Sequence, residues 1–126
     1  MNRFSLAAGG IFCALAVMLG AFAAHGLKSI ISPAMIAVFQ TGVDYQFIHG
    51  LALILFGLLG NGGYKLKWAS IFAIVGIVFF SGSLYLLATT GIKIFGPITP
   101  LGGVCFIVSW LLFTVSVIKH KPAQVK

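Results

Sequence analysis

The sequence contains almost no charge. Charged residues make up 7% of its 126 residues, Asp44 is the only acidic one, and 60% of the residues are hydrophobic. The mean hydropathy is +1.15. A soluble domain of this size has no means of keeping so much apolar surface away from water. The composition therefore excludes a soluble fold and predicts an integral membrane protein.

Cysteines and catalytic motifs are equally scarce. Cys13 and Cys105 stand singly within apolar runs, which excludes a disulfide framework and a CxxC redox or zinc motif. The chain also contains no phosphate-binding loop, no HExxH pair and no Rossmann fingerprint. The sequence therefore predicts buried, inert thiols, no cofactor and no enzymatic activity.

Basic residues lie at the ends of the apolar runs and give a net charge of +7. They form no basic face with interleaved aromatics, so no nucleic-acid partner is indicated. One side of the membrane would contain Arg3, Lys65, Lys67, Lys119, Lys121 and Lys126, and the other Lys28 and Lys93. Because lysine and arginine accumulate in cytoplasmic loops, this distribution predicts that both termini are cytoplasmic.

The apolar runs divide into four segments of membrane-spanning length. Crossing a hydrocarbon core of about 30 Å takes roughly 20 helical residues. We predict one all-α domain, an integral membrane four-helix bundle in a bacterial inner membrane, with spans near residues 4–27, 36–60, 68–88 and 101–118. Ser32 and Pro33 are predicted to open the second helix, and Thr99 and Pro100 the fourth, as capping residue and first helical residue.

Polar side chains within these spans are the candidates for function, because a charged group at the centre of a bilayer costs roughly 2.5–3.5 kcal/mol on insertion scales. We predict that they gather in the extracytoplasmic half of the bundle, whereas cytoplasmic segments such as residues 51–59 and 106–117 are almost purely apolar. The predicted polar cluster consists of His25, Gln40, Asp44, Tyr45, Gln46, His49, Ser83, Tyr85 and Thr99.

Two interpretations stay open for the titratable members of this cluster. Asp44 is either an anchor at the outer headgroup level, paired with Lys28 or Lys93, or a buried functional carboxylate. His25 and His49 are more typical of hydrogen-bonded packing groups than of metal or haem ligands.

Four segments of the chain resemble a known family. They are residues 20–27 (GAFAAHGL), 45–53 (YQFIHGLAL), 80–85 (FSGSLY) and 96–103 (GPITPLGG). Together they are similar to the YgdD-like small membrane proteins (domain of unknown function 423), which include the transmembrane protein 256 group. The resemblance covers nearly the whole chain and implies a four-helix membrane bundle, with no established activity. Ala23 stands where we expect the family to have glycine, a change that would affect helix packing more than chemistry.

Three hypotheses for function follow. The first is a non-enzymatic structural or accessory protein that interacts with membrane lipids, with a second copy of itself or with a membrane partner protein. The second is a small proton-coupled transporter that uses Asp44 and His49 in an outward-facing cavity. The third is a redox subunit with haem held by His25 and His49, facing each other across the first two helices.

Overall fold

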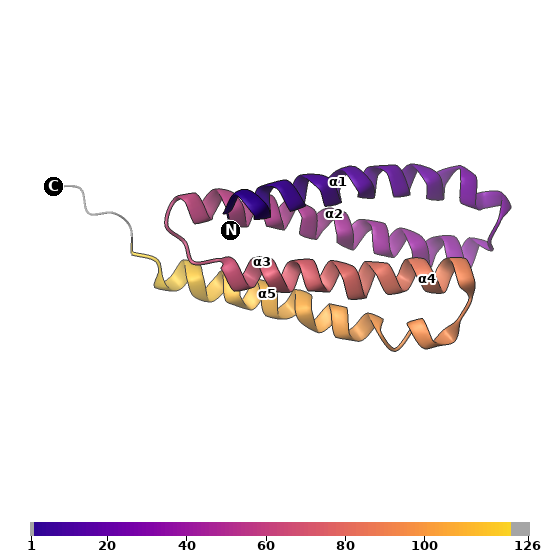
Figure 1. The fold of residues 1–126 in the computed structure, drawn as a ribbon. Coiled ribbons are helices and arrows are strands. Elements are labelled where there is room, and N and C mark those ends of the chain that lie inside the picture. Colours follow the sequence, from indigo (N-terminus) through magenta and orange to yellow (C-terminus); the bar gives the residue numbers. More distant parts are fainter. Residues whose placement is uncertain (1, 122–126) are drawn as a thin grey trace.

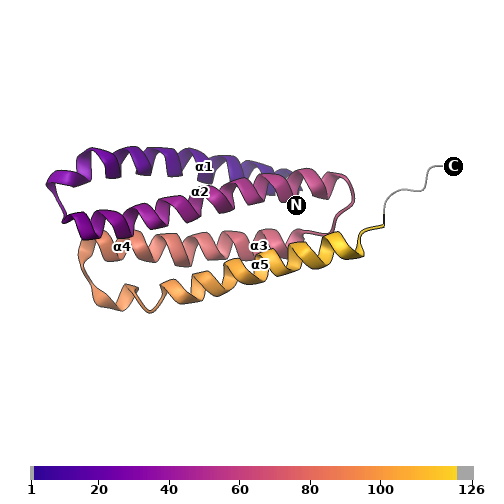
Figure 2. The same ribbon diagram turned by 180° about the vertical axis from the view of Figure 1, so that it is seen from behind.

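The computed structural model describes residues 2–121 as a bundle of long antiparallel helices (Figure 1). In chain order the elements are α1 (Asn2–Ala24), η1 (Gly26–Ser29), α2 (Pro33–Asn61), α3 (Lys67–Gly76), η2 (Ile77–Ser81), α4 (Gly82–Thr90), η3 (Lys93–Phe95) and α5 (Thr99–Lys119). Because α3, η2 and α4 form one continuous rod, the described residues contain four helices long and apolar enough to cross a membrane. The start of α1 and the end of α5 lie at the same end of the bundle in both views (Figure 1 and Figure 2).

Helix starts and stops follow from local sequence chemistry. The Ser32 hydroxyl accepts a hydrogen bond from the Met35 amide, and Pro33 occupies the first turn of α2, as predicted. Gly91 ends α4 with φ +70°, a conformation that glycine adopts without steric penalty. Thr99 is not the predicted cap, because α5 already begins at this residue and the position before it is Ile98. The Thr99 hydroxyl instead contacts Ser83, 2.5 Å away.

The third span contains a feature that the hydropathy pattern does not reveal. Between α3 and α4, η2 is a π-helical turn, in which the Gly82 amide donates to the carbonyl oxygen of Ile77, five residues back. A π turn holds one residue more than an α turn, so α4 is rotated about the rod relative to an uninterrupted α-helix. This rotation determines which α4 side chains face α2.

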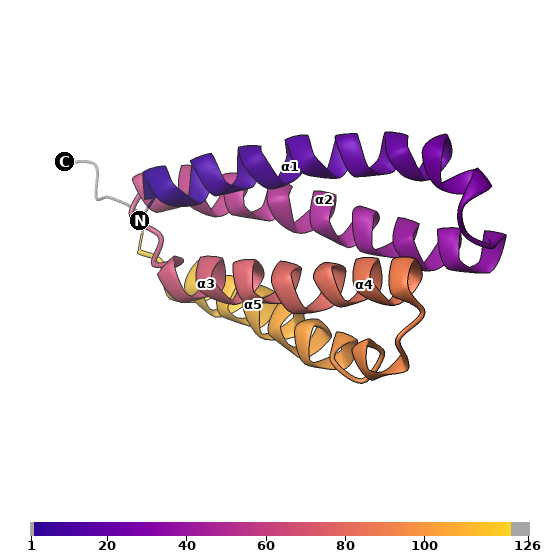
Figure 3. The ribbon, with the colours of Figure 1, turned by 45° about the vertical axis from the view of Figure 1, so that its right-hand side comes forward.

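The four rods associate as two hairpins, with α1 packed on α2 and α5 on α3 (Figure 3). The hairpins meet along α2, which contacts α3, η2 and α4. Half of the apolar stretch of α2 is buried inside the protein, 50% against 17% for the first span. Thus α2 is the central helix, and any internal site has to be built around it.

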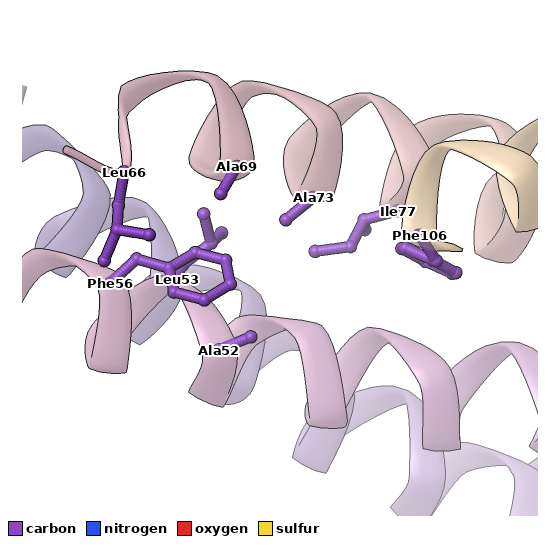
Figure 4. Close-up of a cluster of buried hydrophobic side chains, with 8 residues drawn as sticks. All are labelled: Ala52, Leu53, Phe56, Leu66, Ala69, Ala73, Ile77 and Phe106. Carbon is purple, nitrogen blue, oxygen red and sulfur yellow. The ribbon is translucent and has the colours of Figure 1, made fainter. Parts of the chain in front are cut away.

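Close packing of the rods rests on small residues and a compact apolar core. The larger cluster fills the space between α2 and α3 and reaches α5 (Figure 4); it consists of Ala52, Leu53, Phe56, Leu66, Ala69, Ala73, Ile77 and Phe106. Gly9 allows α1 to approach α2, because a Cβ there would lie 2.6 Å from the Gly50 carbonyl oxygen. Similarly, a Cβ on Gly102 of α5 would collide with the backbone of Phe80.

Candidate functional site

Gln46 is the residue around which the buried polar groups are organised. Its amide nitrogen donates to the Phe12 carbonyl oxygen of α1 at 2.9 Å, and its amide oxygen accepts from the Tyr85 hydroxyl of α4 at 2.6 Å. The side chain is buried, with 4% of its surface exposed. One amide therefore joins three helices and leaves neither of its own polar atoms exposed to lipid.

His49 lies one turn further along α2 and is held on every side. Its Nδ1 is 2.8 Å from the Tyr45 carbonyl oxygen, and its Nε2 is 3.0 Å from the Trp110 indole nitrogen of α5. An indole N–H only donates and a carbonyl oxygen only accepts, so the proton is on Nδ1 and Nε2 is the acceptor. The ring also stacks on Phe106, with the centroids 3.5 Å apart. Both nitrogens of a neutral imidazole are thus occupied.

Two hydroxyl pairs complete the arrangement on the α4 side. Ser81 donates to the Gly42 carbonyl oxygen at 2.7 Å, and Ser83 meets Thr99 of α5. Gly42 is required here because a Cβ would lie 2.8 Å from the Tyr85 ring. Ser81, the last residue of η2, and Tyr85 of α4 thus both bond to α2, whereas Ser83 bonds to α5.

Asp44 lies outside this arrangement. Its carboxylate accepts from the Gln40 amide at 2.9 Å, and the exposed side chain lines a shallow groove between α1 and α2. It follows Pro33 by eleven residues, about 16 Å of helix, whereas Lys28 and Lys93 lie in the connecting turns η1 and η3. Among the described residues Asp44 therefore bonds to Gln40 instead of forming the predicted ion pair with Lys28 or Lys93, and its side chain is not buried within the bundle.

His25 is also separated from the central residues. It is exposed at the end of α1. The contact between Gln46 and Phe12 places His49 beside the middle of α1, and His25 lies a further thirteen residues along that helix, about 20 Å. The prediction that His25 and His49 face each other across the first two helices is therefore wrong.

The predicted confinement of polar groups to one half of the bundle is wrong as well. The middle of α2 falls at Phe47, so Gln46 and His49 are central. In the half expected to be apolar, Ser5 donates to the Leu53 carbonyl oxygen at 2.6 Å and lies 3.2 Å from the Ser70 hydroxyl. Ser109 donates to the Ala69 carbonyl oxygen at 2.7 Å. Ser5, Ser70 and Ser109 within these apolar segments were the available signal, and Trp110, with an N–H that needs an acceptor, was another.

Taken together, the structure brings Gln46, His49, Tyr85, Ser83 and Thr99 into the helix interfaces, with Tyr45 contributing its carbonyl oxygen and an exposed ring against Phe80. It leaves His25, Gln40 and Asp44 outside them. Within residues 2–121, no group of three or more His, Cys, Asp or Glu side chains is placed to hold a metal ion. The hydrogen bonds of Gln46 and His49 join neighbouring helices, and they occupy the polar atoms of both side chains.

Known proteins match this chain over the segments that contain the predicted polar cluster. The family model "Protein of unknown function (DUF423)" matches residues 19–103, which include all nine residues of the predicted cluster. A UPF0382 membrane protein of Staphylococcus haemolyticus (strain JCSC1435) is 44% identical over 112 residues, covering 88% of this chain and 92% of the relative. The UPF0382 membrane protein YwdK of Bacillus subtilis (strain 168) is 45% identical over 115 residues, covering 89% and 94%.

The chain belongs to the DUF423 family. This confirms the resemblance seen in the sequence, and with the four apolar helices it establishes a DUF423 multi-pass membrane protein of all-α fold. The DUF423 relatives are named only as membrane proteins. No solved structure matches the chain.

Proposed function

We propose that this chain is a non-enzymatic structural or accessory membrane protein whose central polar residues fix the register of its helices. On this proposal the protein acts through its outer surface, toward lipids, a second copy or a membrane partner. The observation that carries the proposal is His49, because both of its ring nitrogens are engaged and its face is covered by Phe106. A general base, a proton carrier or a metal ligand needs a free nitrogen.

The same geometry bears on the two other hypotheses. Transport by Asp44 and His49 calls for both groups in one cavity, but Asp44 lies in the outer groove of α1 and α2 while His49 is 3% exposed in the core. Haem ligation calls for a free His49 Nε2, which accepts from Trp110. Nothing in the arrangement favours either hypothesis over a packing role.

The proposal includes the predicted orientation, with both termini in the cytoplasm. Arg3, Lys65, Lys67, Lys119 and Lys121 lie at one end of the bundle, and Lys28 and Lys93 lie in the turns at the other. Lys126, also counted in the sequence-based prediction, lies outside the described residues. The excess of lysine and arginine at the end that holds both termini supports the orientation.

Paired variants test the structural role. Gln46→Leu and His49→Phe should each lower the free energy of unfolding in mixed micelles by about 1–2 kcal/mol, because they strand buried partners on neighbouring helices. His25→Ala, whose side chain makes no capping bond in η1, should leave stability unchanged and serves as the matched control. Equal stability of all three variants would contradict the proposal.

Flux measurements provide the complementary arm. Proteoliposomes given a pH jump should show no proton flux that depends on Asp44, comparing the wild type with Asp44→Asn. This substitution keeps an oxygen acceptor for Gln40 and is expected to leave the fold intact. Flux that is lost in Asp44→Asn would overturn a purely structural role and establish transport.

A further inference from the structure

A second polar feature lies at the lysine-rich end of the bundle, away from the central residues. There the loop between α2 and α3, the start of α3 and the last turns of α5 enclose a half-open cavity of about 650 Å³. Its charged wall is made by Lys65, Lys67, Lys119 and Lys121. Its apolar wall includes Trp68, Leu112 and Val115. The cavity thus has the two-part character of a site for an amphiphile.

No acidic side chain lies in this cavity to balance its charge. Four ammonium groups line it, and the chain's single acidic side chain, Asp44, lies in the separate groove between α1 and α2. Ammonium groups gathered in one cavity repel one another unless an anion lies between them. An anion supplied from outside the protein would balance this charge.

The hydroxyl group of Ser116 also indicates an anionic ligand. Ser116 also lines the cavity, and its Oγ is buried with no hydrogen-bond partner among the described residues. Buried polar atoms in proteins are nearly always paired. A donor left over beside four lysines suits an oxyanion, which accepts several hydrogen bonds at once.

The walls of the cavity are held in place by contacts between the loop and α5. The Tyr64 ring stacks on His120 with centroids 3.7 Å apart and an angle of 14°. Gly63, at φ +96°, carries the chain past His120, where a Cβ would lie 3.4 Å from the His120 ring. The Lys67 ammonium lies 5.8 Å from the centre of the Trp68 ring. The site is therefore largely formed before a ligand arrives.

The position of the cavity favours a lipid headgroup over a free anion. Trp68 is 61% exposed at the start of the third span, where an interfacial aromatic meets lipid headgroups. Leu112 and Val115 continue the apolar wall along α5 in the direction of the hydrocarbon. Basic pockets between membrane helices are known to take anionic headgroups. An apolar wall beside the charge fits an acyl chain, which a free anion lacks.

We propose that this cavity binds an anionic phospholipid, with the headgroup phosphate among the four lysines and Ser116, and an acyl chain along Trp68, Leu112 and Val115. This inference rests on the proposed function insofar as the protein acts through its surface. It names a ligand class for a site distinct from the central polar residues.

Trp68 supplies an internal reporter for the test. The protein is reconstituted in phosphatidylcholine vesicles that contain a small fraction of a dibrominated lipid, either phosphatidylglycerol or phosphatidylcholine. Bromine quenches tryptophan on contact. The chain's other tryptophan, Trp110, is partly buried and donates its indole N–H to His49, and its contribution is the quenching that remains in Trp68→Phe. Brominated phosphatidylglycerol should quench more strongly than brominated phosphatidylcholine. The excess should vanish in Trp68→Phe.

Charge-matched double variants locate the binding. Lys65→Gln with Lys119→Gln removes one lysine of the charged wall from the loop and one from α5, and should weaken the preference for phosphatidylglycerol by roughly 25-fold, about fivefold per lysine. Lys28→Gln with Lys93→Gln makes the same change in net charge at the opposite end and should leave the preference intact. Ser116→Ala changes no charge and should weaken it by about tenfold.

Several results would overturn the inference. Equal quenching by the two brominated lipids would exclude anionic selectivity, and equal losses in the two double variants would reduce it to bulk attraction. Displacement of the lipid by inorganic phosphate, at ionic strength matched with chloride, would assign the cavity to free phosphate instead. The lipid test can fail while Gln46→Leu and His49→Phe still lose stability as expected. The proposed function would then stand without the lipid site, so the two proposals are separately testable.

Discussion

Two pairs of adjacent glycines give the sharpest test of the packing described above. Gly9 and Gly10 are neighbours in α1, but a Cβ on Gly9 would lie 2.6 Å from the Gly50 carbonyl oxygen, whereas one on Gly10 would have nothing within 4 Å. Gly102 and Gly103 repeat this pattern in α5. The first would collide with the Phe80 backbone, and the second would lie 3.8 Å from the Phe80 ring.

The size of the effect follows from these distances. Ordinary contact begins near 3.4 Å, so Gly9→Ala requires α1 to move about 0.8 Å from α2 at this point. A gap of 0.5–1 Å forfeits a quarter to a half of the dispersion energy of the atoms concerned. Overpacking of this kind costs about 1–3 kcal/mol. Gly10→Ala meets no neighbour and gains up to about 1 kcal/mol of helix propensity.

The assay is the free energy of unfolding in mixed micelles of a mild detergent and dodecyl sulfate, followed by far-ultraviolet circular dichroism. We expect Gly9→Ala and Gly102→Ala to lower stability, and Gly10→Ala and Gly103→Ala to leave it unchanged or raise it. Because both substitutions of a pair gain the same helix propensity, the members of each pair should differ by the overpacking cost, roughly 1–3 kcal/mol. If the two single substitutions of a pair shift the free energy of unfolding by the same amount and sign, the close approach of α1 to α2 and of α5 to η2 is refuted.

Three further predictions concern single contacts. In a double-mutant cycle, His49→Phe and Trp110→Phe should show a coupling energy of about 0.6–1.7 kcal/mol in micelle unfolding, and a value of zero would show that the bond between them contributes nothing. Asp44→Leu should lower the apparent insertion free energy of the second span by about 3 kcal/mol in a glycosylation-scored insertion assay, because the carboxylate lies near the middle of α2. Gly91→Ala should lower stability by about 1–2 kcal/mol, because its φ of +70° strains a Cβ that otherwise has open space, and an unchanged melting midpoint would contradict this backbone conformation.

The membrane fold was predictable because its signals are local. Hydropathy over a span, Ser32 followed by Pro33, and lysines at the ends of apolar runs each depend on residues close together in the chain. The structure accordingly begins α2 at Pro33. Boundaries shifted where turn geometry intervened, as at Ala24, where α1 ends and a short 3₁₀ turn follows.

The site was less predictable because it depends on the rotation and register of whole helices. A spacing of four residues places Gln40 and Asp44 on one face of α2, but it does not say whether that face meets a helix or lipid. The partner of His49 is 61 residues away, on a helix whose register is determined by glycine contacts. Titratability was also a poor guide, since the neutral amide of Gln46 joins more helices than Asp44 does.

The π turn η2 has a consequence for how chain length can vary within the family. An extra residue in an α-helix is absorbed either by rotating everything that follows or by a local π turn that leaves both flanks facing as before. A relative with one residue fewer between positions 77 and 81 would close this turn into an ordinary α-helix, with α3 and α4 still in contact with α2. An alignment of relatives should therefore tolerate a single-residue gap here, at a position that hydropathy alone would place in the middle of an unbroken membrane span.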